Sequence, residues 1–355
     1  MGGCLVWVRV GHVDVAKGLS ILLVALGHSG LLSGFYGLNG ALALVRLPLF
    51  FFLAGVFFKR QEDVPDFLAR RGDSLLKPYL VASLLFLWLD YYEGKDPRFA
   101  DFLGIFWGTQ GSVVETPFWF LPHLFALLLV CAVMFRRVGE RWLSGWRLAG
   151  IIAVLFVTGA FGMESLKGFK GPSAVSGLEV LQLPFSLELV PWSLSLFLAG
   201  YGLRGWVKEL EVRWWMVPLG LAAVWLGHYQ LHGYVNLDGR AFGPLLPSAL
   251  ASAGGILAAL GLSVYCLRVG WLRRFLEWCG RGSLVLLIFH SPVFGHLDWW
   301  GMPKVPAFVL SIVLSLGIFE LIRRVKVLRW GFLPLRVPRN RSFPSARRAA
   351  PELRD

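Results

Sequence analysis

The stretch GHVDVAKGLSILLVALGHSG, residues 11 to 30, sets the class of this protein. Apolar residues predominate from about residue 16 to residue 34, a run that contains Lys17 and His28, and charged residues precede it. A run of roughly 17 to 25 mainly apolar residues has the length that an α-helix needs to cross a bilayer. No clear small-x-small cleavage site follows the run, which favours a retained signal anchor over a removed signal peptide.

Nine further apolar runs follow, each bounded by charged residues, Pro or Gly. The chain carries only 35 basic and 22 acidic side chains in 355 residues, and 56% of its residues are hydrophobic. An average soluble protein of this length would hold roughly 89 charged residues, so the composition excludes intrinsic disorder and argues against a soluble enzyme. We therefore expect an all-α, polytopic membrane bundle of about ten transmembrane helices. The expected spans lie near 16–34, 41–58, 75–91, 118–135, 147–163, 186–203, 213–229, 245–267, 283–298 and 305–322.

The net charge of +13 is explained by where the basic residues lie. Most Lys and Arg residues precede the first span or follow an even-numbered span. Cytoplasmic loops carry such an excess, so the pattern predicts that both termini are cytoplasmic. The same excess attracts anionic lipid, and we expect membrane lipid but no nucleic acid as a partner.

The chain divides into two expected parts. Residues 1–325 form the transmembrane domain, and residues 326–355 form a basic, Pro-containing cytoplasmic tail that we expect to be disordered. Within the first part, LFFFLAGVFFK at 49–59 recurs as LSLFLAGYGLR at 194–204. This echo is compatible with an ancient duplication, or with coincidence between two span ends that each need a small Gly contact.

The first span carries three ionisable residues, and such groups within a membrane are functional candidates by default. Lys17 and His28 are eleven residues apart, which places both side chains on one helix face, about 16 Å apart along the axis. Asp14 shares this face. The alternative is that Lys17 only anchors the topology and that His28 is only a satisfied core histidine.

Other polar residues in the spans admit two interpretations each. His290 lies deep in the ninth span; His123 follows Trp119 by four residues, which favours core packing. Arg46 lies at the outer end of the second span, where it either snorkels or binds an acceptor. His228 and His232 have the spacing of a metal pair but no third ligand, so we expect no metal site. No Walker, GxSxG or HExxH motif is present.

Five segments, in order, resemble motifs of the acyltransferase 3 family of integral membrane O-acyltransferases. In the first, Asp14, Lys17, Gly18 and His28 fill the positions of an acidic residue, a basic residue with Gly, and an intramembrane histidine. The family often has Arg at the basic position, and Lys17 is similar to the subgroup that resembles fucose acetylases. The other segments are Pro48 to Gly55, Arg70-Arg71 with Lys77-Pro78-Tyr79, Trp119-Phe120-Leu121, and Gly280 with Ser283, His290 and Pro292.

This resemblance, which covers about residues 9 to 322, implies transfer of an acyl group, expected to be acetyl, from cytoplasmic acyl-coenzyme A to a hydroxyl of a sugar or envelope glycan. It implies acetyl-coenzyme A as a co-substrate, no permanently bound cofactor, and a multi-pass place in a bacterial cytoplasmic (inner) membrane. Acyl transfer to a hydroxyl needs a base and a group that stabilises the oxyanion. The expected roles are catalytic for His28, Asp14 and His290, donor-binding for Lys17, Arg70, Arg71 and Lys77, and acceptor-binding for Arg46 and Trp119.

Two questions stay open on the sequence alone. Transfer can be direct or pass through an acyl-histidine intermediate. The rival function is a multispan transporter or flippase for a polar solute or glycolipid. Ten spans with a few buried polar groups suit it, but no inverted pair of broken helices supports it.

Overall fold

The apolar runs of the sequence form helices. The computed structural model describes residues 11–60, 63–94, 97, 99–113, 116–166, 182–211, 213–237 and 239–335. Within these ranges the secondary structure is almost all helical. The strands are two residues each, β1 (Val235–Asn236) and β2 (Ala241–Phe242), and pair antiparallel with Val235 opposite Phe242. The predicted all-α class is confirmed.

The helices have the following bounds. They are α1 (Gly11–His28), α2 (Tyr36–Val56), α3 (Val64–Arg71), η1 (Gly72–Leu76), α4 (Lys77–Tyr92), α5 (Phe99–Trp107), η2 (Thr116–Trp119), α6 (Phe120–Arg137), η3 (Glu140–Trp142), α7 (Gly145–Ser165), η4 (Pro184–Leu189), α8 (Val190–Gly202), α9 (Arg204–Lys208), α10 (Met216–Val224), η5 (Trp225–Gln230), α11 (Leu245–Cys266), α12 (Gly270–Arg281), α13 (Ser283–Trp299), α14 (Lys304–Arg324) and α15 (Lys326–Phe332).

Among the described residues, six helical segments are long and apolar enough to cross a membrane. They are Tyr36–Val56, Val64–Tyr92, Pro117–Arg137, Gly145–Ser165, Leu245–Cys266 and Lys304–Arg324. The other four expected spans coincide with α1, α8, α10 with η5, and α13, which are shorter. The structure thus has helices at all ten expected positions, whereas ten crossings and cytoplasmic termini stay predictions.

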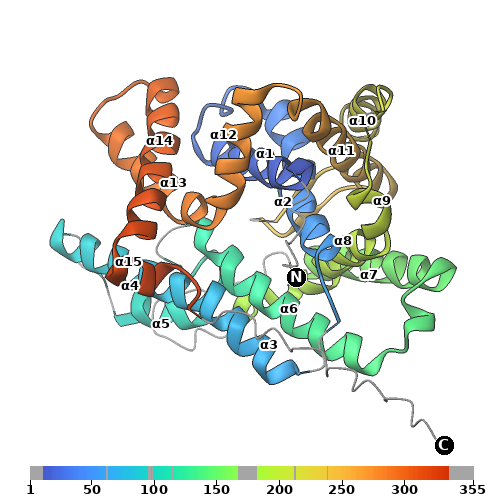
Figure 1. Cartoon of the computed structure of the whole chain (residues 1–355), viewed down its shortest axis with the longest axis horizontal. Helices are drawn as coiled ribbons and strands as arrows, with labels where there is room; N and C mark the ends of the chain where they lie inside the picture. Colours follow the sequence, from blue (N-terminus) through green and yellow to red (C-terminus); the bar gives the residue numbers. More distant parts are fainter. Residues whose placement is uncertain are drawn as a thin grey trace, which may run out of the picture.

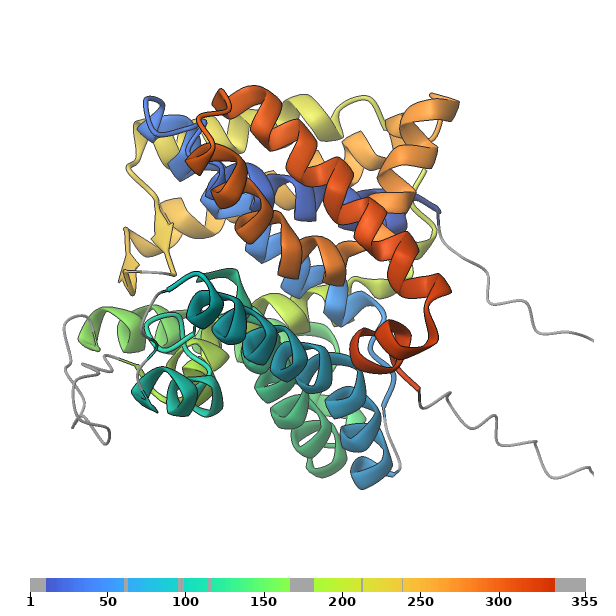
Figure 2. The same cartoon turned by 90° about the vertical axis from the view of Figure 1, so that its left-hand side faces the viewer.

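Helix α1 lies inside the assembly of helices, between α2, α11 and α12 in Figure 1 and behind α13 and α14 in Figure 2. It packs on α12 with the two backbones in direct contact. A Cβ on Gly18 would lie 2.1 Å from the carbonyl oxygen of Leu276, and one on Gly280 would lie 2.2 Å from that of Asp14. The glycine after Lys17 therefore has a packing role, because any side chain there would push α12 away.

The repeated FLAG tetrapeptides of α2 and α8, residues 52–55 and 197–200, pack against each other. A Cβ on Gly55 would lie 1.8 Å from the carbonyl oxygen of Phe197, and one on Gly200 would lie 1.9 Å from that of Phe52. Each glycine thus sits on the phenylalanine that begins the other tetrapeptide. Small residues allow such close helix contacts in membranes, so the echo in the sequence marks one shared interface.

The stretch expected to be the tail begins with an ordered helix. Helix α15 packs on α4. Just after it, Lys77 Nζ lies 2.8 Å from the carbonyl oxygen of Leu333, and the amide of Leu335 donates to Asp73 Oδ2 at 2.6 Å. Residues 326–335 are therefore packed on the bundle, and residues 336–355 of the expected tail lie outside the described residues.

We expect Gly55→Ala and Gly200→Ala to destabilise the protein, because each added methyl group meets backbone atoms that cannot move aside independently. Overpacking of this kind costs about 1–3 kcal/mol, which lowers the midpoint of thermal unfolding in detergent. Gly150→Ala, in α7, is the matched control, since a Cβ there meets nothing within 4 Å. Equal midpoints for Gly55→Ala and Gly150→Ala would contradict the interface.

Candidate functional site

A cavity of about 380 Å³ opens where α1, α2, α13, the start of α6 and strand β1 meet. It brings together His28, Arg46 and Trp119, three residues expected from the sequence to take part in the chemistry or in acceptor binding. The wall also contains Asn39, near the start of α2, and Asn236, in the short strand β1. Neither residue could be identified from the sequence, because neither belongs to a motif. The lining residues are Val24, His28, Tyr36, Asn39, Gly40, Ala43, Arg46, Leu47, Pro117, Trp119, Phe120, Tyr234, Val235, Asn236, Leu237 and Leu287.

Arg46 enters the cavity beside His28 because Gly27 has no side chain. A Cβ on Gly27 would lie 1.7 Å from Arg46 Nη1, so the guanidinium rests directly on the backbone of α1. Its Nη1 donates to Asn39 Oδ1 at 3.3 Å, and Ser20 Oγ donates to its backbone oxygen at 2.7 Å. The structure thus places this cation at the cavity wall, against the backbone of the residue that precedes His28.

His28 also lies next to His290 of α13. The two ring centroids are 5.7 Å apart, with a tilt of 58°. His290 is 2% exposed, and its Nδ1 lies 2.6 Å from the carbonyl oxygen of Leu286. A carbonyl only accepts, so Nδ1 carries a proton, and Nε2 is buried with no hydrogen-bond partner among the described residues. His290 therefore offers an unused acceptor nitrogen close to His28.

Lys17 lies toward the other end of α1, about 16 Å from His28 along the helix axis, as the helical spacing predicted. Its Nζ is 5.0 Å from the centroid of the Phe57 ring, just past the end of α2. Asp14 lies close enough to interact with it electrostatically. Lys17 and His28 thus both meet the α2 segment, one at its end and one near Arg46, in agreement with the predicted shared face.

A second lysine, which the sequence did not single out, joins this end of the site. Nζ of Lys208, in α9, lies 5.8 Å from the centroid of the same Phe57 ring. Helix α9 is held on α1 by His12, whose Nε2 is 2.7 Å from the carbonyl oxygen of Val207. Phe57 is 40% exposed, so two ammonium groups lie close to an accessible aromatic ring.

The basic segment expected to bind the donor is largely engaged in contacts within the protein. Arg70 forms an ion pair with Asp66, and Lys77 forms one with Asp73 at 2.6 Å. The guanidinium of Arg71 lies 5.1 Å from the Phe67 ring, which in turn packs on Phe58 at 5.9 Å. Phe58 follows Phe57 in the sequence, so Arg71 contacts a ring that packs next to the segment that meets Lys17.

Two further buried groups do not contribute a reactive centre. His123 is fully buried, with Nε2 3.1 Å from Ser193 Oγ and Nδ1 3.3 Å from the carbonyl oxygen of Phe185, in agreement with core packing. Cys279 is buried in α12 against α1, and burial raises the pKa of its thiol to about 12. The neutral thiol is not a nucleophile at neutral pH.

The described residues contain no group of three or more His, Cys, Asp or Glu side chains that could hold a metal ion. His228 instead binds the backbone: its two ring nitrogens lie 2.7 Å from the carbonyl oxygen of Gly233 and 2.8 Å from that of Gly37. This histidine therefore fastens the start of α2 to the segment that leads into β1.

Comparison with known proteins gives one match. A family model described as an acyltransferase domain, Acyl_transf_3, matches residues 10–324. No curated protein and no solved structure shows a significant match to the chain.

The contacts of His290 predict its tautomer. We expect ¹⁵N NMR of histidine-labelled protein in detergent to show Nε2 as an unprotonated nitrogen and Nδ1 as protonated, because only Nδ1 faces a carbonyl oxygen. Loss of these signals in His290→Gln would assign them. A protonated Nε2 would contradict the arrangement.

Proposed function

Since this chain belongs to the acyltransferase family whose model matches residues 10–324, we propose that it moves an acetyl group from acetyl-coenzyme A to a hydroxyl of a sugar or envelope glycan. The six apolar helices and the family make it a multi-pass membrane protein, and we assign it to a bacterial inner membrane. The observation that carries the proposal is the cavity that places Arg46 beside His28. No comparison supports a transporter.

The acceptor side of the proposal rests on the chemistry of the cavity wall. Tyr36, Trp119 and Tyr234 supply aromatic rings, and Asn39 and Asn236 supply amides that both donate and accept. Sugars present apolar ring faces and outward hydroxyls, which aromatic rings and amides can bind together. The lining mixes apolar and polar side chains, and a concave site in which placed polar groups fix the orientation of the ligand is typical of small-molecule binding.

The donor side rests on the lysine end of α1. Lys17 and Lys208 both lie close to the exposed Phe57 ring, a combination that suits the phosphates and the adenine of coenzyme A. Lysine binds phosphate as a point charge. Arg70, Arg71 and Lys77 add to the positive field at this end, although their ion pairs make them weaker candidates for direct contact.

The two ends are related through α1. Lys17 and His28 are about 16 Å apart along the helix axis, so the charged part of the coenzyme can stay at one end while its long arm carries the thioester to the cavity. Asp14 holds Lys17 in place in this scheme. The helix therefore links donor binding to the reacting groups.

In the reaction that we propose, His28 accepts the proton of the acceptor hydroxyl as its oxygen attacks the thioester carbonyl. The Arg46 guanidinium stabilises the oxyanion of the tetrahedral intermediate, as positioned cations do in acyl transfer. Collapse of the intermediate breaks the carbon–sulfur bond, and the leaving thiolate takes the proton from His28. The acceptor nitrogen of His290 helps to orient the ring of His28.

We expect His28→Ala to lower acetyl transfer by about 10²- to 10⁴-fold, the usual contribution of a positioned base, while the protein still purifies as a folded species. The assay uses purified protein in detergent, radiolabelled acetyl-coenzyme A and a panel of methyl glycosides, without a membrane gradient. His296→Ala, a substitution outside the cavity, is the control. Full activity of His28→Ala would contradict this mechanism.

We expect Lys17→Ala and Lys208→Ala each to raise the KM for acetyl-coenzyme A by roughly ten- to a hundredfold, the range for one lost charge-assisted contact. The KM for the methyl glycoside should stay within about twofold, because the lysines lie at the far end of α1. Lys17→Arg should retain donor use, and Lys326→Ala is the control. Unchanged donor KM in Lys17→Ala would leave this lysine as a topology anchor.

A further inference from the structure

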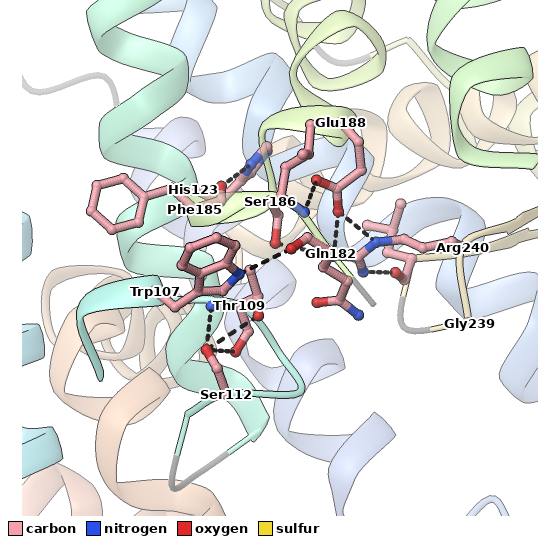
Figure 3. Close-up of polar contacts among 12 residues, drawn as sticks. Trp107, Thr109, Ser112, His123, Gln182, Phe185, Ser186, Glu188, Gly239 and Arg240 are labelled. Atoms are coloured by element: carbon pink, nitrogen blue, oxygen red, sulfur yellow. Dashed lines mark hydrogen bonds and ion pairs between the residues drawn. The ribbon is translucent and has the colours of Figure 1, made fainter. Parts of the chain in front are cut away.

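A buried ion pair lies next to the cavity but does not line it. Glu188 of η4 and Arg240, in the turn between β1 and β2, are 2% and 4% exposed in their side chains. Arg240 Nε lies 2.9 Å and Nη2 2.8 Å from the same oxygen, Oε1, of Glu188. Figure 3 shows the two side chains pointing toward each other from separate segments.

The rest of both charged groups binds the surrounding loops. Arg240 Nη1 donates to the carbonyl oxygen of Leu237, and Nη2 donates to Ser186 Oγ at 3.0 Å. The other oxygen of Glu188 accepts from the backbone amide of Leu183 at 3.2 Å. The pair therefore fastens two loops that are far apart in sequence.

The same network holds strained backbone. Among the described residues, four residues other than glycine have a positive φ, and three of them belong here: Phe185 at 57°, Ser186 at 52° and Arg240 at 51°. This region of φ is unfavourable for residues with a Cβ. Such residues cluster at active sites and ligand-binding sites, where the surrounding structure holds them in the unfavourable conformation.

The network contacts two residues that line the cavity, Trp119 and Leu237. The Arg240 guanidinium carbon lies 5.8 Å from the Trp119 ring centroid, and Nη1 binds the backbone of Leu237. Trp119 and Leu237 both line the cavity, and so does β1. Strand β1 is paired with β2, whose Phe242 amide donates to Glu164 Oε2 of α7 at 3.1 Å.

Stability alone does not explain this arrangement. Taking two charges out of water costs several kcal/mol for each ion, and an apolar pair of similar volume is often as stable or more stable. Breaking a buried pair is costly, however, because it leaves one charge without compensation. A buried ion pair therefore favours the loop geometry in which its two side chains meet over geometries that separate them.

We propose that Glu188 and Arg240 are positioning residues that hold the Trp119 wall and the β1 wall of the cavity, and thereby set which acceptor the cavity takes. The effect on the acceptor rests on the proposed function, whereas the hold on the two walls does not. Neither residue touches the acceptor; both act through Trp119, Leu237 and β1.

Hydrogen–deuterium exchange in detergent tests the hold on the walls without any substrate. In Glu188→Gln we expect backbone amides of 234–237 and 239–242 to exchange about tenfold faster, the change that follows loss of one charge-assisted contact. Amides of α13 and α14 should be unchanged. Glu277→Gln, which alters the exposed Arg273–Glu277 pair, is the matched control. If Glu188→Gln fails to fold, Arg240→Lys serves as the second variant. It keeps the positive charge but loses the planar guanidinium, which presents several N–H donors at once, and we expect the same faster exchange of these amides.

Kinetics test the consequence for the acceptor. With the methyl glycoside that the wild-type protein acetylates fastest, we expect Arg240→Lys to raise the acceptor KM about tenfold and to leave the KM for acetyl-coenzyme A within about twofold. A merely structural defect would instead lower the active fraction and leave both KM values unchanged.

The two readouts separate the possible failures. Faster exchange at β1 with no acetylation of any glycoside by the wild-type protein would support the hold on the walls while contradicting the proposed function. Unchanged exchange in both folded variants would overturn the positioning role, and an unchanged acceptor KM would overturn its effect on the acceptor.

Discussion

The contact between Arg46 and the bare backbone of Gly27 is the interaction on which the site depends. It brings a guanidinium from α2 onto α1 one residue before His28. A side chain at position 27 would occupy the place of the cation. Helix α1 is in turn held against α12 by the close packing of Gly18, in α1, on the backbone of Leu276 and of Gly280, in α12, on the backbone of Asp14. The glycines, which have no side chain, thus allow the close contacts that place Arg46 beside His28.

The low dielectric constant of the protein interior limits where charged side chains can lie. Charged groups are tolerated there only when they are paired or line a polar cavity. The described residues follow this rule in two ways: Arg46 lies at a cavity with amides around it, and Arg240 lies in an ion pair with Glu188. The first arrangement places a cation at the wall of the cavity. The second uses a cation to fix the loops that shape the same cavity.

Helix α1 connects two different environments. Lys17 shares the exposed ring of Phe57 with Lys208, whereas His28 faces a cavity lined by aromatic and amide side chains. A donor with an anionic end and a long arm suits this length better than a small solute would. The division between the two ends gives the acyltransferase proposal its physical basis.

The sequence by itself determined the helical class, the positions of the helices and the shared face of Lys17 and His28. These features follow from local composition and from the 3.6-residue period, which need no knowledge of distant residues. The sequence also showed the FLAG echo, but not that Gly55 and Gly200 meet each other, since nothing local states which helices pack together.

Only the tertiary structure decided the composition of the site. Asn39 and Asn236 reach one cavity from a helix and a strand, Lys208 joins Lys17 through α9, and Glu188 meets Arg240 across 52 residues of sequence. None of these residues has a local pattern that sets it apart. Their roles arise from the close packing of segments far apart in the chain, and a sequence pattern records neighbours along the chain but not neighbours in space.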